Sequence, residues 1–251
     1  MVTAVAGGGG RVFAPDWRWT LVALLLAAAF ARLGVWQWQR GEQRQASAAR
    51  FARGADAVLE LGTRAVDEAP LYQRIGVEGE LDAAHQFLLD NRTFEGRAGY
   101  EVLTPLVRAP PPAPALLVDR GWVPFTGSRA RLPDVTLEAG GPVRFTGRVA
   151  LLPAPGLASG RAAPAGTGPW PRVTRYPDMA QLAAALGRPL SSRILLLDPA
   201  APFGYVRAWQ SPGLPPLRHF SYALQWWSFA LATIVLWAVL SRRTQPPAAP
   251  S

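Results

Sequence analysis

Hydrophobic residues are concentrated in two long runs, one toward each end of the chain. The first run, WRWTLVALLLAAAFARLGVWQW, begins at Trp17, and the second, SYALQWWSFALATIVLWAVL, begins at Ser221. About 20 predominantly apolar residues are enough to cross a bilayer as a helix. The pattern therefore predicts transmembrane helices over residues 17–39 and 219–240.

The first run has a second interpretation, a cleaved signal peptide. Arg11 and Arg18 would form its charged region, and the alanine-rich residues 27–31 would lie near a cleavage site. However, Trp36 and Trp38 follow directly, and tryptophan is enriched where a helix leaves the bilayer. We therefore favour a retained helix and keep the cleaved form as the alternative.

Between the two runs the pattern changes to short stretches rich in Val, Leu, Tyr and Phe, bounded by Gly, Pro, Asn or Asp, as is typical of strands. They cover residues 71–81, 85–91, 99–107, 115–125, 142–152 and 193–198. Their spacing favours an antiparallel sheet or a partly closed barrel over alternating parallel units. Two Pro-rich segments, 109–115 and 153–169, interrupt these stretches and are predicted as mobile loops.

Helical signals flank and interrupt the strands. Residues 40–53 contain almost no helix breaker, so we expect the first helix to continue beyond the membrane. Asp178 and Gln181 have the spacing of a capping box, and Gly187 provides a stop signal. We therefore expect a membrane protein in which two transmembrane helices flank an α+β, mainly antiparallel β-sheet extracytoplasmic domain over residues 40–218.

The composition narrows the classes of function. The formal net charge is +9, but every basic residue is arginine, and the arginines are scattered without a run of five. We attribute them to a general compositional bias and expect no nucleic-acid partner. The chain has no cysteine, two histidines and two methionines, too few soft ligands for a self-contained copper or zinc site. It also has no glycine-rich phosphate loop, no G-x-S-x-G and no histidine pair at helical spacing, so we expect no enzyme.

The arginines give a weak preference for orientation in the bilayer. Two spans place both termini on the same side. Arg242 and Arg243 favour a cytoplasmic C-terminus, whereas the arginines within 40–53 pull the other way. Long translocated domains are largely exempt from the positive-inside rule, so the preference is for cytoplasmic tails at 1–16 and 241–251.

His219 is the residue whose side chain is best suited to a chemical role, and it lies two residues before the second apolar run. Tyr222, Trp226 and Phe229 fall on the same helical face as His219. A histidine at or within the membrane is a functional hypothesis by default, although anchoring at the headgroups is the alternative. As a ligand it would offer one imidazole to a haem iron, with the aromatic face against the macrocycle. His85, in a strand-like stretch, is not expected to be a second axial ligand.

Two further groups of polar residues are candidates for structural contacts. Gly34, Gln37 and Arg40 lie roughly on one side of the first helix, where small and amide residues would let the two helices pack closely. Asp119 and Arg120 stand beside a tryptophan, where we expect a local salt bridge or a stacking contact.

Three blocks of the sequence resemble the Surfeit locus protein family, whose members assist cytochrome c oxidase biogenesis. The blocks are LGVWQWQR at 33–40, LLDNRTFEGRAGYEVLTPL at 88–106 followed by LLVDRGWVP at 116–124, and HFSYALQWWSFA at 219–230. Together with the two terminal apolar runs, the resemblance extends in order over nearly the whole chain. The positions that we take from them as structural or interaction sites are Gly34, Trp36, Gln37, Arg40, Asn91, Arg92, Gly99, Tyr100, Arg120, Gly121 and Trp122.

The resemblance implies a non-enzymatic assembly factor with termini in the cytoplasm or matrix, the domain in the periplasm or intermembrane space, and no cleavage of the first span. It also implies a link to haem a, held transiently, with His219 as the metal ligand and Tyr222 and Trp226 beside it. The implied partners are cytochrome c oxidase subunit one, other oxidase assembly factors, haem a synthase and the lipid bilayer. The first 16 residues do not resemble a mitochondrial transit peptide, so we expect a bacterial inner membrane.

Two alternatives from other classes remain open. One is a protein-only scaffold that stabilises an oxidase assembly intermediate without holding haem; it would be colourless when purified. The other is a membrane-anchored sensor, which predicts a small-molecule pocket and no oxidase defect when it is deleted.

Overall fold

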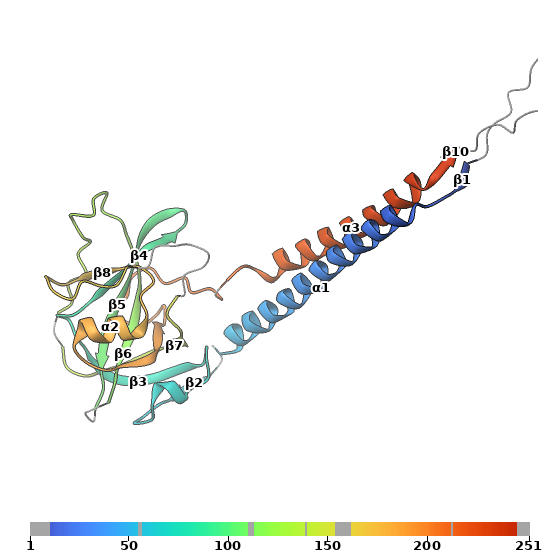
Figure 1. Ribbon diagram of the computed structural model, residues 1–251. Coiled ribbons are helices and arrows are strands. Elements are labelled where there is room, and N and C mark those ends of the chain that lie inside the picture. Colours follow the sequence, from blue (N-terminus) through green and yellow to red (C-terminus); the bar gives the residue numbers. More distant parts are fainter. Residues whose placement is uncertain are drawn as a thin grey trace, which may run out of the picture. The chain divides into compact units, whose positions relative to one another are not determined.

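The computed structural model describes residues 11–54, 57–109, 113–138, 140–153, 162–211 and 213–244. The chain forms two compact units: a helical unit, made of residues 1–48 and 212–251, and a sheet domain, Ala49–Ser211 (Figure 1). Residues 110–112 and 154–161, which include the centres of the two predicted loops, lie outside the described residues.

The helical unit is built on two long helices that lie side by side (Figure 1). Helix α1 spans Trp17–Arg53 and helix α3 spans Pro216–Leu240. Their most apolar 18-residue windows have mean hydropathies of 1.8 and 1.7, and only 11% and 6% of these windows is buried. Both helices are therefore long and apolar enough to cross a membrane. The predicted helical continuation over 40–53 is confirmed, and α3 begins three residues before the predicted span because Pro216 fits its first turn.

A two-stranded antiparallel sheet joins the N-terminal end of α1 to the C-terminal end of α3, and the sequence pattern did not predict it. Its strands are β1, Arg11–Phe13, and β10, Arg242–Thr244, with Phe13 opposite Arg242. The ring of Phe13 packs edge-on against Trp237 of α3, with 5.6 Å between ring centroids.

The sheet domain contains eight paired strands, two short helical elements and no long helix of its own among the described residues. Its elements are β2 Val58–Glu60, η1 Val66–Glu68, β3 Arg74–Leu81, β4 Phe87–Phe94, β5 Arg97–Val107, β6 Ala115–Pro124, β7 Val143–Ala150, β8 Arg172–Thr174, α2 Met179–Leu186 and β9 Leu190–Leu197. The six predicted stretches correspond to β3, β4, β5, β6, β7 and β9, with ends that differ by a few residues.

The strands β3, β7, β9, β6 and β5 follow one another in the sheet, and β5 pairs back to β3 through Glu80↔Val107 and Leu81↔Leu106. This closes a five-stranded barrel, as the prediction of a partly closed barrel allowed. Most pairings are antiparallel, but β2–β3, β4–β8 and β6–β9 are parallel. The prediction of a mainly antiparallel sheet is therefore confirmed, although these three parallel pairs were not foreseen.

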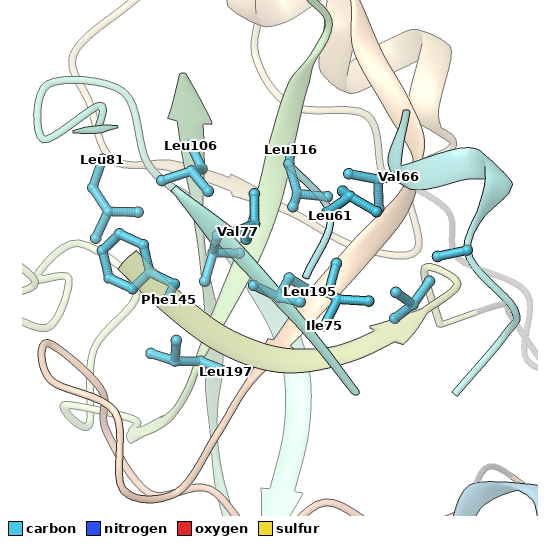
Figure 2. Packing of buried hydrophobic residues seen from close by; sticks show 13 residues of the cluster. Leu61, Val66, Ile75, Val77, Leu81, Leu106, Leu116, Phe145, Leu195 and Leu197 are labelled. Atoms are coloured by element: carbon cyan, nitrogen blue, oxygen red, sulfur yellow. The ribbon is translucent and has the colours of Figure 1, made fainter. Parts of the chain in front are cut away.

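Alternating strand residues fill the barrel (Figure 2). Ile75 and Val77 of β3 pack with Phe145 of β7 and with Leu116 and Val118 of β6, all at most 2% exposed. Because side chains alternate across a strand, the intervening Leu117 points outward, into a second cluster that contains Leu182 of α2. Each fully buried side chain of this size contributes about 1.5–3 kcal/mol of hydrophobic stabilisation.

Helix α2 begins and ends where the sequence predicted. The Asp178 carboxylate accepts from the Gln181 backbone N–H, and the Gln181 side chain accepts from the Asp178 backbone N–H in return. This reciprocal box satisfies two backbone donors that the first turn leaves free. Gly187 ends the helix at φ 74°, in the left-handed region that glycine adopts without strain.

Candidate functional site

His219 lies in the first turns of α3 and is bound to α1 through its ring. Its Nδ1 atom lies 3.0 Å from Oε1 of Gln37. The amide oxygen only accepts, so Nδ1 carries a proton and donates it, and in the neutral form of the ring the lone pair is on Nε2. Nε2 itself exposes less than 1 Å² and has no hydrogen-bond partner. The helix pair therefore holds an imidazole in the tautomer whose free nitrogen is able to bind a metal.

Two glycines of α1 allow α3 to approach closely at this level. A Cβ atom on Gly34 would lie 2.2 Å from Nε1 of Trp227, and one on Gly41 would lie 2.5 Å from Cε1 of Phe220. Neither position has room for a side chain while the indole or phenyl ring stays in place. The predicted role of Gly34 in close helix packing has this physical basis.

Aromatic rings pack between α1 and α3, the helices that carry Gln37 and His219. Trp226 stacks on Phe30 of α1 with centroids 5.7 Å apart, and Phe229 packs within 5.8 Å of both rings. Trp38 of α1 packs against Phe220 of α3, with centroids 4.8 Å apart. Phe30 was missed by sequence reasoning, because a phenylalanine within an apolar run carries no signal of its partner.

Three residues that the sequence grouped with this site lie outside the contact between the helices. Tyr222 is 50% exposed and Trp36 is 56% exposed. Arg40 is exposed and donates to Gln43 of its own helix rather than facing α3. On α3, Ala223 is fully buried, and the neighbouring Tyr222 is turned about 100° from it around the helix axis.

The central blocks lie in the sheet domain, where most of the selected positions have structural roles. A Cβ atom on Gly99 would lie 2.2 Å from the carbonyl oxygen of Val123. Gly121 has φ 111°, and a Cβ atom there would lie 2.6 Å from the carbonyl oxygen of Val206. Tyr100 is 1% exposed in the core. These positions shape the backbone and the packing of β5 and β6.

Other selected positions lie around an irregularity of β4. The register between β4 and β5 shifts between Leu89 and Arg92, and the intervening Asn91 adopts φ 63°. Asparagine tolerates this left-handed conformation better than most residues. Trp122 donates from Nε1 to the carbonyl oxygen of Arg92 at 3.4 Å, which supports the strand beyond the irregularity.

A buried acid, Asp119, and a partly buried acid, Glu101, lie on the outer face of β6 and β5. Arg92 forms an ion pair with Glu101 at 3.0 Å, and Asp119 is 1% exposed beside them. Burial raises the pKa of Asp119 well above its usual range, and the nearby charge of Glu101 raises it further. Burial also raises the pKa of Glu101, against the opposing effect of Arg92. Asp119 and Glu101 were not selected as site residues, although an acid within the apolar stretch ALLVD was a usable signal.

Asp119 and Arg120 point to opposite faces of β6, so the predicted contact between them does not form. The Asp119 carboxylate accepts from the Gly121 backbone N–H at 3.0 Å. Arg120 turns inward and stacks over Tyr205, 4.9 Å from the ring centroid, rather than over Trp122. The register of β5 and β6 shifts opposite Arg120 and Gly121, which requires the positive φ of the glycine.

Comparison with known protein families identifies the chain. The SURF1 family model matches residues 24–231, which include His219, Gln37 and the three sequence blocks. The chain belongs to the SURF1 family. Membership implies a role in cytochrome c oxidase assembly and an interaction with the assembly machinery, and it confirms the resemblance found in the sequence. A search of curated proteins gave no match.

The described residues of this member of the SURF1 family offer one unpartnered imidazole nitrogen, which would serve as a single axial ligand if a haem were bound. His219 offers an orphaned buried nitrogen with its lone pair free. The other histidine, His85, belongs to the sheet domain, where its Nδ1 lies 2.9 Å from both carboxylate oxygens of Asp82. Within the described ranges, no group of three His, Cys, Asp or Glu residues is placed to hold a metal ion.

Proposed function

We propose that this SURF1 protein assists the insertion of haem a into the catalytic subunit of cytochrome c oxidase, and that His219 holds the haem transiently as it is passed on. The observation that carries the proposal is the orphaned Nε2 of His219, whose lone pair is fixed by the bond from Nδ1 to Gln37. Haem iron accepts a neutral imidazole as an axial ligand. The partners on this proposal are subunit one, other oxidase assembly factors and haem a synthase.

The burial of Nε2 suits cargo that is held briefly. Because Nε2 exposes less than 1 Å², the side chains packed around it must move aside before it reaches an iron. Trp226 and Phe229 lie on the same side of the helix pair and would provide an apolar surface for the macrocycle. Tyr222, which is half exposed, lies beside them on α3 and would contact the edge of the haem.

The proposed setting is the inner membrane of a bacterium. On this proposal residues 17–39 and 219–240 cross the bilayer, residues 40–218 form a periplasmic domain, and the tails 1–16 and 241–251 are cytoplasmic. This setting is supported by the low burial of the two apolar helices. Leucines such as Leu24 and Leu231 are at least 60% exposed, and a bilayer would cover them where water otherwise would.

The test compares the two histidines of the chain. The full-length protein is produced together with haem a synthase, purified in detergent, and examined by optical spectroscopy. We expect His219→Ala to abolish the haem spectrum while the protein remains membrane-inserted, and His85→Ala to retain it. A full haem spectrum in His219→Ala would refute the ligand assignment.

The same purification tests the rival function. If the wild-type protein is colourless and still co-purifies with subunit one, the chain is a protein-only scaffold that stabilises an assembly intermediate.

A further inference from the structure

A second polar site lies at one end of the barrel in the sheet domain. Leu116 and Val118 of β6 point into the barrel core, and Arg120 continues their inward-facing series beyond it. A cavity of about 370 Å³ adjoins the Arg120 side chain. The mouths of β-barrels are common ligand sites when a few polar groups converge on an apolar pocket.

Arg120 is 3% exposed, and all its hydrogen-bond partners are neutral. Nε donates to the carbonyl oxygen of Phe203 at 2.6 Å, and Nη1 donates to Oε1 of Gln86 at 2.8 Å and to Oγ1 of Thr104 at 3.4 Å. None of the ion pairs found among the described residues includes Arg120. A buried charge without a counter-charge is costly, so an anionic partner would stabilise it.

The donors that remain free point to the class of ligand. Nη2 of Arg120 makes one long contact, 3.4 Å to the hydroxyl oxygen of Tyr205. The Tyr205 hydroxyl accepts there, and its own hydrogen has no acceptor among the described residues. Both residues line the cavity, and the contact between Nη2 and the Tyr205 hydroxyl brings their polar groups together. A guanidinium and a hydroxyl together match the oxygens of a carboxylate.

The remaining walls set the size and charge of the ligand. Phe203 and Leu137 provide apolar surface, and Thr136 adds a hydroxyl. Phe203, whose carbonyl oxygen accepts from Arg120, has φ 62°. This left-handed conformation is rare for phenylalanine, and strained residues of this kind cluster at functional sites. Glu138 is exposed at the rim and is the acidic side chain of the lining.

We infer that the barrel mouth of the sheet domain binds a small organic carboxylate, held by Arg120 and the Tyr205 hydroxyl. This site is distinct from His219 and does not depend on the proposed haem-carrying role. The carboxylate replaces the missing counter-charge of Arg120, and the negative charge of Glu138 opposes its entry.

Equilibrium dialysis of the full-length protein in detergent micelles, with radiolabelled succinate as the probe, tests the inference. We expect saturable binding of one succinate per chain, absent from empty micelles and displaced by unlabelled succinate but not by neutral succinamide. Displacement by inorganic phosphate as effective as that by succinate would overturn the assignment to carboxylates.

Conservative variants separate this site from nonspecific binding without removing the buried arginine. Tyr205→Phe, which loses one hydrogen bond, should weaken succinate binding by about fivefold. Glu138→Gln should tighten it by about two- to fivefold, because a like charge is removed. The control Glu78→Gln changes an exposed acid on β3 that does not line this cavity and should have no effect, as should His219→Ala. Equal binding in Tyr205→Phe, Glu138→Gln and the wild type overturns the proposal.

Discussion

The amide oxygen of Gln37 on α1 lies 3.0 Å from Nδ1 of His219 on α3, and this bond determines which ring nitrogen of the histidine is free. Both residues lie within the part of the chain that matches the SURF1 family. A ligating histidine usually donates its other N–H to a carbonyl or carboxylate, which fixes the tautomer and makes the ligand more basic. Gln37 is therefore a positioning residue for the proposed haem ligand.

The first prediction tests whether Gln37 acts as a hydrogen-bond acceptor for His219 or only fills space between the helices. Gln37→Leu removes the acceptor and should lower haem occupancy by about tenfold, whereas Gln37→Glu keeps an oxygen facing Nδ1 and should retain it. The readouts are the haem spectrum of the purified protein and the ¹⁵N chemical shifts of the His219 ring, which report the tautomer directly. Equal occupancy in the two variants would show that Gln37 does not orient the ring.

The second prediction concerns the close approach of the helices at Gly34. A Cβ atom there would lie 2.2 Å from Nε1 of Trp227, so Gly34→Val must displace the indole or move α3. Overpacking of this kind costs about 1–3 kcal/mol. The measurement is the fraction of unfolded protein in mixed micelles as the proportion of denaturing detergent is raised. Ala31→Val, at an exposed position of the same helix, is the matched control and should unfold as the wild type does.

The parts of the fold that were predictable carry their signals locally. The apolar runs predict α1 and α3. The capping box that marks the start of α2 lies within one four-residue segment, from Asp178 to Gln181. The parallel pairing of β9 with β6 was not predictable, because it depends on contacts between segments about 75 residues apart, such as Leu117↔Ile194. The three-residue strands β2 and β8 are likewise defined by their partner strands rather than by a pattern of their own.

The histidine of the candidate site could be selected from the sequence, but the rotation of α3 about its axis could not be predicted. His219 was selected because a histidine at the start of an apolar helix is costly without a role. Tyr222 was grouped with it by spacing alone, but the buried Ala223 shows that α3 is turned so that Tyr222 remains half exposed. The stacking partner Phe30 had no signal, since which phenylalanine meets Trp226 depends on how the helices pair.

The third prediction uses the absence of cysteine from the chain to test the small sheet at the helix ends. Phe13 and Arg242 are directly opposite in the antiparallel pair, so cysteines at both positions should form a disulfide when the purified protein is oxidised. The shift in mobility on a non-reducing gel after protease cleavage between the helices reports it. Cysteines at Phe13 and Arg243 point to opposite faces and should remain unlinked. Linkage of both pairs to the same extent would show that the register is not fixed.

The last prediction concerns the stability of the sheet domain as a function of pH. Burial, together with the charge of Glu101, raises the pKa of Asp119 well above the ordinary value of 3.8 that it has in the unfolded chain. Above pH 3.8 the unfolded chain loses this proton while the folded chain still binds it. The stabilising contribution is therefore complete below that pH and is lost as the pH rises through the raised folded pKa. Asp119→Asn keeps an oxygen to accept from the Gly121 N–H and never ionises.

We therefore expect Asp119→Asn to match the wild-type melting temperature near pH 4 and to exceed it by a margin that grows toward pH 8. The measurement is the difference in melting temperature between the two proteins, in which groups that titrate alike in both cancel. Asp134→Asn provides a control of opposite sign, because hydrogen bonds from Thr136 lower the pKa of Asp134 in the folded protein. That substitution should lower the melting temperature slightly at neutral pH. A constant difference across the range for Asp119→Asn would mean that the buried carboxyl is ionised throughout and compensated by Arg92.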